Sequence, residues 1–542
     1  MTFLRKASAS VITLILLLSA MPRVASAGDA DKPAGWPVTA LLPPDTLLVV
    51  TVTDAQKAIA KLQKTGLWNI YNNPEVQRAF RAPLMTAQFA MAMAEAQGGF
   101  KIADLVSYFS QGEISLAILG VDKRTPEGQP MPDFLISIQA REKTQLLMDE
   151  IGRRLDQLKA QAGGQITITQ TPVGNSIVHK ISMPLPQGPM SVQYTQCDGD
   201  VIFAFGDGRL EKLLAMHERF KDTPPKAVEG QAAEVLSQNA AFQKVLEKSG
   251  SESDLMVYLN WEALTKNPIL DARPKTDKEK RDWQAVGLID IRAISYCSGI
   301  KDKGIRESFY IDIPVASRKG LLGLADGEGL KAEALAAAPR NALIAGAFQI
   351  APDKVLERVL DLAALENPKA KEEINTFLLA IGQQLNLDVK KETLNALTGQ
   401  AVFSVSLAAK HPKLAIGFPQ PLLSLGIKDI AAAKSLISAL RNAAKDNFDF
   451  SDLSTGEHEI VTARERFAQG REPAQISFVL DKKDVILSLY PLALREELSR
   501  RAMMAKGYDA THPNNMLVGS LADDNDFKSA RASLSGQPQA ML

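Results

Sequence analysis

Hydrophobic positions recur along the chain with two different periods, which predicts helices and strands in mixed order. A spacing of three and four residues predicts amphipathic helices over residues 57–67, 142–160 and 209–220. Short alternating runs predict strands at residues 47–52, 114–121, 134–138, 166–169, 177–181, 190–195, 201–205, 255–259, 291–297 and 305–313. Tight turns separate several of these runs, and such short connections favour antiparallel pairing. We therefore expect an α+β fold in which an antiparallel sheet carries helices on one face.

The chain repeats its own pattern at a distance of about 285–295 residues. Five blocks match in the same order: residues 44–50 with 339–345, 112–116 with 399–403, 177–178 with 460–461, 200–202 with 484–486, and Leu236, Phe242 and Met256 with Leu521, Phe527 and Met541. Stacking repeats have periods of roughly 20–50 residues, so this period excludes a solenoid. We predict two related units, residues 44–314 and 339–542, joined by a linker at residues 315–338.

The second unit ends inside its last predicted strand. Its final residue, Leu542, aligns with Val257, so it has no counterpart of residues 258–313. We expect a truncated second unit with Met541 at the margin of a sheet. The alternative is a natively shorter unit with a frayed last strand.

The first 27 residues have the pattern of a secretory signal peptide. Arg5 and Lys6 precede an apolar stretch at residues 11–18, and the small residues 25–27 form a cleavage site. We expect cleavage before Gly28, a surface leader at residues 28–43 and an exported chain in the periplasm or outside the cell. The alternative, an uncleaved anchor, is disfavoured because the apolar stretch is too short to span a bilayer.

Composition narrows the possible partners. Lys and Arg together number 62, as do Asp and Glu, and aromatic residues are 6% of the chain. No global basic charge and few stacking side chains argue against a nucleic-acid partner. Beyond the signal peptide, no apolar run is long enough for an integral membrane segment.

Residue types that carry chemistry are scattered. Cys197 and Cys297 each close a predicted strand; in an oxidising compartment they form one disulfide or remain two buried thiols. No two of the five histidines have metal-binding spacing, and His217 continues an apolar helix stripe, which predicts a partly buried histidine. The acidic residues 523–526 precede a predicted helix, which favours an N-cap over a calcium site.

No catalytic motif appears, so we assign no catalytic, cofactor-binding or metal-binding residue and no cofactor. Helices at residues 75–95, rich in Met, and at 371–387, with a stripe that includes Phe377, are typical of core packing.

The start of the predicted mature chain resembles a family of large exported bacterial proteins of unknown function, common in planctomycete-type genomes. The resemblance rests on residues 42–50, then 65–68 and 73–76, and covers mainly the first hundred residues. It implies an exported α+β protein and supplies no activity, ligand or catalytic residue.

These observations lead to three hypotheses about function. The first is an exported, non-catalytic binding or structural protein of the periplasm or cell envelope, acting on an unknown envelope partner or ligand. The others are an envelope hydrolase with dispersed catalytic residues and a carrier of an apolar molecule. A pocket with convergent titratable groups would favour the hydrolase, and an apolar tunnel would favour the carrier.

Overall fold

The computed structural model describes residues 38–541 with gaps, of which the longest are residues 79–111, 408–418, 507–519 and 529–539. The chain divides into two compact units. The first comprises residues up to 273 together with 290–314, and the second comprises 274–289 together with 315–542. The predicted first unit ends at residue 314, and residues 274–289 within it belong to the second compact unit.

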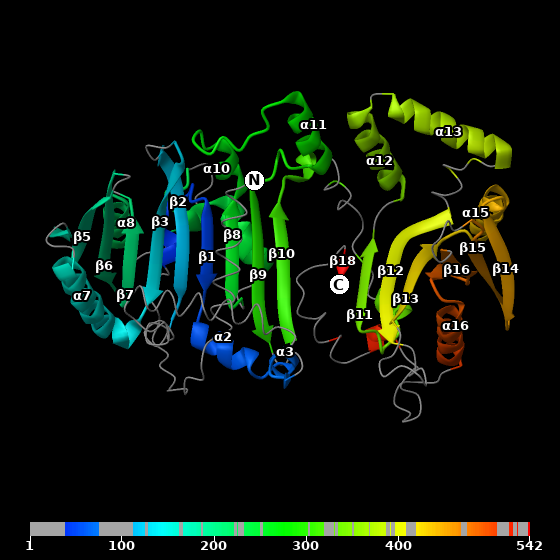
Figure 1. Ribbon diagram of the computed structural model, residues 1–542, viewed down its shortest axis with the longest axis horizontal. Coiled ribbons are helices and arrows are strands. Elements are labelled where there is room, and N and C mark those ends of the chain that lie inside the picture. Colours follow the sequence, from blue (N-terminus) through cyan, green and yellow to red (C-terminus); the bar gives the residue numbers. More distant parts are fainter. Residues whose placement is uncertain are drawn as a thin grey trace. The chain divides into compact units, whose positions relative to one another are not determined.

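The first unit is built on a ten-stranded antiparallel sheet with the order β10-β9-β8-β1-β2-β3-β7-β6-β5-β4 (Figure 1). Its strands are β1 (Leu48–Val52), β2 (Ile114–Arg124), β3 (Pro130–Gln139), β4 (Thr167–Val173), β5 (Ser176–Leu185), β6 (Gly188–Cys197), β7 (Asp200–Phe205), β8 (Leu255–Asn260), β9 (Ala293–Lys301) and β10 (Gly304–Asp312). Strands β4 to β7 form a meander of hairpins. The predicted antiparallel α+β fold is confirmed.

Helices pack on both faces of this sheet, whereas the sequence predicted them on one face. Along β7, Val201 and Phe203 contact the cluster under α7, whereas Ile202 and Ala204 contact Leu210 and its neighbours on α8. Successive strand residues point to opposite faces, so α7 and α8 cover opposite sides of β7. The described helices of this unit are α2 (Ala55–Leu62), α3 (Gly66–Tyr71), α7 (Thr144–Gln161), α8 (Arg209–Phe220), α9 (Ala240–Ser249) and α10 (Trp261–Lys266).

The second unit has an eight-stranded antiparallel sheet with the order β14-β15-β16-β17-β13-β12-β11-β18. Its strands are β11 (Ile344–Gln349), β12 (Leu397–Leu407), β13 (Pro419–Ile427), β14 (Phe448–Thr455), β15 (His458–Glu465), β16 (Gln475–Leu480), β17 (Asp484–Ser488) and β18 (Ala540–Met541). Its helices include α11 (Asp277–Val286), α12 (Pro352–Glu366), α13 (Ala370–Leu385), α15 (Ile430–Ala444) and α16 (Pro491–Ala505).

The two sheets have the same topology. The second sheet, read from β18, has the order β18-β11-β12-β13-β17-β16-β15-β14, and the first sheet, read from β8, has the order β8-β1-β2-β3-β7-β6-β5-β4. Each strand of the second sheet therefore corresponds to the strand of the first sheet whose number is lower by ten. The residue pairing agrees as well: Thr51 pairs with Met256 in β8, and Ala347 pairs with Met541 in β18. The two units therefore repeat one fold, as the sequence predicts, and β18 lies at the edge of its sheet.

The repeated unit begins earlier than predicted. A short 3-10 helix precedes β1 (η1, Val38–Leu41), and another precedes β11 (η6, Ala334–Ala337). The backbone N–H of Leu236 donates to the Leu42 carbonyl at 2.6 Å, and the N–H of Leu521 donates to the Ala338 carbonyl at 3.0 Å. These are equivalent hydrogen bonds, since Ala338 follows Leu42 by 296 residues and Leu521 follows Leu236 by 285.

The predicted leader and linker are consequently corrected. Within residues 28–43, Leu41 and Leu42 are buried in the core of the first unit. Within residues 315–338, Leu330 and Leu335 are buried in a core cluster of the second unit. Leu41 and Leu335 lie in short 3-10 turns, η1 and η6, and a single turn is too short to produce a periodic pattern.

Other expectations also change. Cys197 and Cys297 are free thiols, because β6 and β9 are separated by five intervening strands of one sheet, far beyond disulfide reach. In α13, Phe377 is 62% exposed, because the helix periodicity identifies an apolar side without providing a partner for it.

The predicted helix at residues 75–95 lies outside the described residues, apart from Arg78. Within the described part of the chain, no helix is long and apolar enough to cross a membrane.

Candidate functional site

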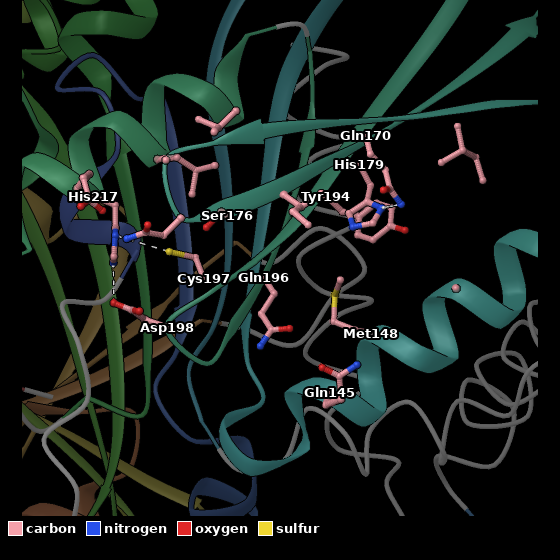
Figure 2. Close-up of a pocket in the computed structure, with 18 of the residues that line it drawn as sticks. Gln145, Met148, Gln170, Ser176, His179, Tyr194, Gln196, Cys197, Asp198 and His217 are labelled. Atoms are coloured by element: carbon pink, nitrogen blue, oxygen red, sulfur yellow. Dashed lines mark hydrogen bonds and ion pairs between the residues drawn. The ribbon is translucent and has the colours of Figure 1, made fainter.

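A hollow of about 1300 Å³ lies at the β4–β6 end of the first sheet, bordered by α7 and α8. One face of α7 contributes residues at helical spacing, from Gln145 to Lys159, and α8 contributes His217. Figure 2 shows two groups of side chains along it: Cys197, Asp198 and His217 at one end, and Gln170, His179 and Tyr194 at the other.

The turn between β6 and β7 places the first group. Asp198 and Gly199 both have positive φ, 46° and 87°, and Cys197 pairs with Asp200 across the turn. This backbone is the form preferred in two-residue hairpins, and an Asp-Gly pair tolerates it. The turn therefore fixes Cys197 at the end of β6 and leaves Asp198 exposed at the tip.

His217 joins the turn residues to α8. Its Nδ1 lies 3.6 Å from the Cys197 sulfur, and its Nε2 lies 3.2 Å from an Asp198 carboxylate oxygen (Figure 2). The side chain is 18% exposed, which confirms the prediction of a partly buried histidine. One donor atom from each of the three residues lies within 4.8 Å of the others.

The thiol in this group is held in its protonated form. Burial raises the pKa of Cys197 to about 11, and the negative charge of Asp198 adds to the shift. A thiol with this pKa is ionised in roughly one molecule in ten thousand at pH 7, and the thiolate is the nucleophilic form. The group is thus poorly suited to thiol catalysis without a further ligand.

A buried carboxyl group lies just behind the turn. Asp200 is 8% exposed, and its Oδ1 has no hydrogen-bond partner among the described residues. Burial raises its pKa to about 7, and the charges of Glu113 and Asp198 add to the shift. Asp200 lines a small cavity with Cys197, Asp198 and His217, so negative charge gathers on this side of the group.

The other end of the hollow is aromatic and amide-rich. His179 stacks on Tyr194 with 4.6 Å between ring centroids and 15° between ring planes. The amide nitrogen of Gln170 lies 3.4 Å from His179 Nδ1. Burial lowers the pKa of His179, so this ring favours its neutral form. Neutral stacking and amide groups suit a polar, uncharged ligand better than an apolar one.

The second unit has a hollow of about 920 Å³ that shares with the first hollow the part beside the turn and α8, whose counterpart is α16; no described residue of α15, the counterpart of α7, lines it. Equivalent positions line both hollows, among them the pairs Ser176 and His458, Cys197 and Asp481, Asp198 and Lys482, Leu214 and Leu498, and His217 and Arg501. The strand pairing that matches β5 to β7 with β15 to β17 supports this equivalence, and it corrects the predicted match of residues 177–178 with 460–461 by one residue, since Val178 is the counterpart of Ile460. The hollow therefore belongs to the repeated fold.

The side chains in the second hollow form a different network. Arg501 takes the place of His217 and donates to Asp481 at 3.0 Å, Asp484 at 2.7 Å and Glu497 at 2.7 Å. Burial opposes the charge of Arg501, but the carboxylates of Glu497 and Asp484 outweigh it and raise its pKa. Asp484 is the counterpart of Asp200, so the second unit supplies a cation where the first does not.

The sequence analysis predicted neither hollow and assigned no binding role to the residues that line them. Cys197 and His217 are 20 residues apart, and only the fold of the β6–β7 hairpin against α8 brings them together. Of the other histidines, His179 and His458 line the two hollows, whereas His411 and His512 lie outside the described residues. In the acidic run, Asp523 accepts hydrogen bonds from the Ser520 backbone and hydroxyl, and residues 524–526 are not described.

Comparisons with known proteins add no relative. No protein-family model, curated protein or solved structure matches this chain.

Proposed function

We propose that this is an exported binding protein of the periplasm or cell envelope, with one ligand-binding hollow in each of its two units. The observation that carries the proposal is the recurrence, in both units, of a hollow beside the β6–β7 turn and α8 or their counterparts, the β16–β17 turn and α16. Packing defects arise independently, whereas a hollow kept in two diverged copies of a fold is typical of a binding site. The signal-like pattern of residues 1–27 supports export.

The differences between the hollows support two distinct ligands. Leu214 and Leu498, which anchor the helices, are identical, and both are buried. The neighbouring hollow residues Cys197 and His217 correspond to Asp481 and Arg501, which have different chemistry. Positions that hold the fold are thus retained, while positions that face a ligand have changed.

The test is retention of a small molecule by the first unit. Gly152 lies on the α7 face that lines the hollow, and no atom lies within 4 Å of a Cβ built there, so Gly152→Trp extends into open space. Leu158 is 48% exposed on the same helix outside the lining, so Leu158→Trp is the matched control.

Purified chain from residue 28 onward is incubated with a small-molecule extract of the envelope fraction and measured by native mass spectrometry. We expect a bound mass on wild type and Leu158→Trp and a loss of at least about tenfold in occupancy on Gly152→Trp. Absence of a bound mass on wild type, or equal occupancy in all three chains, contradicts the proposal.

One observation favours a second candidate, an envelope hydrolase that uses a thiol. Cys197, His217 and Asp198 form a continuous chain of contacts, as nucleophile, base and orienting group do in such enzymes. The raised pKa of Cys197 opposes this role. Alkylation by iodoacetamide distinguishes the two: a hydrolase needs rapid reaction of Cys197 at pH 7, whereas a binding protein leaves the thiol unreacted until the pH is well above 9.

A further inference from the structure

We propose that Cys197, Asp198 and His217 bind a divalent transition-metal ion of the zinc class in the hollow of the first unit. This inference rests on the proposed binding function and names a ligand for one of its two hollows. The three side chains come from the β6–β7 turn and from α8, and their donor atoms already lie within 4.8 Å of one another.

The donor set selects the class of metal. One sulfur, one imidazole nitrogen and one carboxylate oxygen suit Zn²⁺ and similar borderline ions, whereas Ca²⁺ and Mg²⁺ require oxygen donors. On a tetrahedral Zn²⁺ ion, neighbouring donor atoms are roughly 3.3–3.7 Å apart. The 3.6 Å from the Cys197 sulfur to His217 Nδ1 falls in this range, whereas Asp198 contacts the other ring nitrogen, Nε2, and would have to move toward the shared ion.

The site can contract around an ion without disturbing the core. Asp198 lies at the tip of a hairpin with its side chain 54% exposed, so its carboxylate can move by about an ångström. His217 then offers the ion one ring nitrogen. Three protein ligands leave a fourth position toward the hollow, which is the arrangement of an open zinc site.

The second unit gives an independent argument for a cation at this place. There, the Arg501 guanidinium lies among the carboxylates of Asp481, Asp484 and Glu497. In the first unit the counterpart of Asp484 is Asp200, which is buried with an unpartnered oxygen in the cavity shared with Cys197, Asp198 and His217. A bound cation would supply in the first unit the positive charge that Arg501 supplies in the second.

Binding changes the protonation of one ligand. Zn²⁺ displaces the proton of the Cys197 thiol, so that a sulfur–zinc bond replaces the S–H bond and one proton enters the solvent. Asp198 binds as the carboxylate. No oxidant or reductant is required.

The experiment uses chelator-treated chain from residue 28 onward, titrated first with Co²⁺ and then with Zn²⁺. We expect one equivalent of Co²⁺ with a thiolate-to-cobalt charge-transfer band and the intense visible bands of a four-coordinate ion, and we expect Zn²⁺ to abolish both. Cys197→Ser should remove the charge-transfer band, and His217→Gln should weaken binding by more than about tenfold.

Two variants serve as matched controls. Cys297→Ser removes the other thiol of the same unit, and His179→Gln removes a histidine of the same hollow; both should bind metal as wild type does. The double variant Cys197→Asp/His217→Arg installs the side chains of the second unit and should fold without binding the metal. Its folding, checked by circular dichroism, separates loss of the site from loss of structure.

The outcomes distinguish this inference from the proposed function. A wild-type chain that takes up no Co²⁺, or a Cys197→Ser chain that keeps the charge-transfer band, overturns the metal site. If the metal fails to bind while a small molecule is still retained in a manner that depends on Gly152, only this inference fails. If the metal binds but no small molecule is retained, the metal site stands and the proposed two-ligand function fails.

Discussion

The buried ion network of the second unit offers the sharpest test of how the two copies have diverged. The side chains of Glu497 and Arg500 are 2% and 5% exposed, and they form a two-pronged ion pair with contacts of 2.6 and 2.8 Å. At the equivalent positions the first unit has Leu213 and Met216. Glu497→Leu therefore introduces the side chain that the first unit has at this position, which is Leu213.

We expect the single substitution Glu497→Leu to be strongly destabilising. Removing one partner of a buried ion pair costs about 3–5 kcal/mol, because the remaining charge is left without compensation. Arg500 keeps the Ala337 carbonyl at 3.2 Å and the sulfur of Met504 at 3.0 Å as partners. Arg501 keeps Asp481 and Asp484. The cost should consequently lie near the lower limit, at about 3 kcal/mol.

The double variant Glu497→Leu/Arg500→Met should recover most of this loss. Well-packed apolar residues replace a buried ion pair at little or no cost, so we expect stability within about 1 kcal/mol of wild type. In the Glu497→Leu background, Arg500→Met should therefore restore about 2 kcal/mol. The pair Leu213 and Met216 shows that the repeated fold has room for these side chains.

Hydrogen–deuterium exchange of the amides in β15 to β17 measures the effect locally, with β5 to β7 of the first unit as an internal reference. A loss of about 3 kcal/mol speeds exchange by roughly 100-fold. Acceleration below about tenfold in the single variant refutes the reasoning about the buried charge. Equal acceleration of exchange in the single and double variants refutes the inference that the second unit can accommodate the apolar pair found in the first unit.

Three further predictions concern the first unit and the leader. The pKa of Asp200 is about 7 in the folded protein, above its value of about 3.9 in the unfolded chain, so the free energy of unfolding of chelator-treated protein should fall as the pH rises from 4 to 7. Asp200→Asn should remove this loss, which is up to about 4 kcal/mol in total. Urea unfolding of both proteins at pH 5 and pH 8 measures the difference. Gly199→Ala should cost about 1 kcal/mol in the same assay because its φ is 87°, whereas Gly152→Ala in the middle of α7 should add about 0.5–1 kcal/mol, and equal effects would contradict the backbone argument. Export predicts that amino-terminal sequencing of the mature protein begins at Gly28, and a chain that retains residues 1–27 would contradict it.

The sequence was sufficient for the fold class and the repeat, because both depend on hydrophobic periodicity. Strands such as β1 and β7 are short, nearly continuous apolar runs, as expected of strands that are covered on both faces. The order of matched blocks also predicted that β7 and β17 occupy the same place in their sheets. The start of the repeat was missed because η1 and η6 bury their residues in single 3-10 turns, too short to show a period.

The group of Cys197, Asp198 and His217 could not be predicted in the same way, because these residues follow no common period. Cys197 ends a strand, Asp198 belongs to a turn, and His217 closes an apolar helix stripe, so each has an ordinary local explanation. Their proximity is a tertiary fact, set by how α8 packs across the β6–β7 hairpin. A comparison of the two copies would have given one signal, since the repeat aligns Cys197 with Asp481 and His217 with Arg501.

That alignment bears on how a duplicated fold acquires different sites. The hairpin end beside α8 or α16 is enclosed by strands on one side and by a helix on the other, so any polar group there is partly desolvated. In the second unit, the guanidinium of Arg501 forms ion pairs with three carboxylates, which compensates the desolvation of these groups. The first unit has His217 in place of that arginine and has the buried carboxyl group of Asp200. Because a buried carboxylate without a counter-charge is costly, the first unit either keeps Asp200 protonated or gains a cation from outside, and the donors Cys197, Asp198 and His217 are placed to hold one.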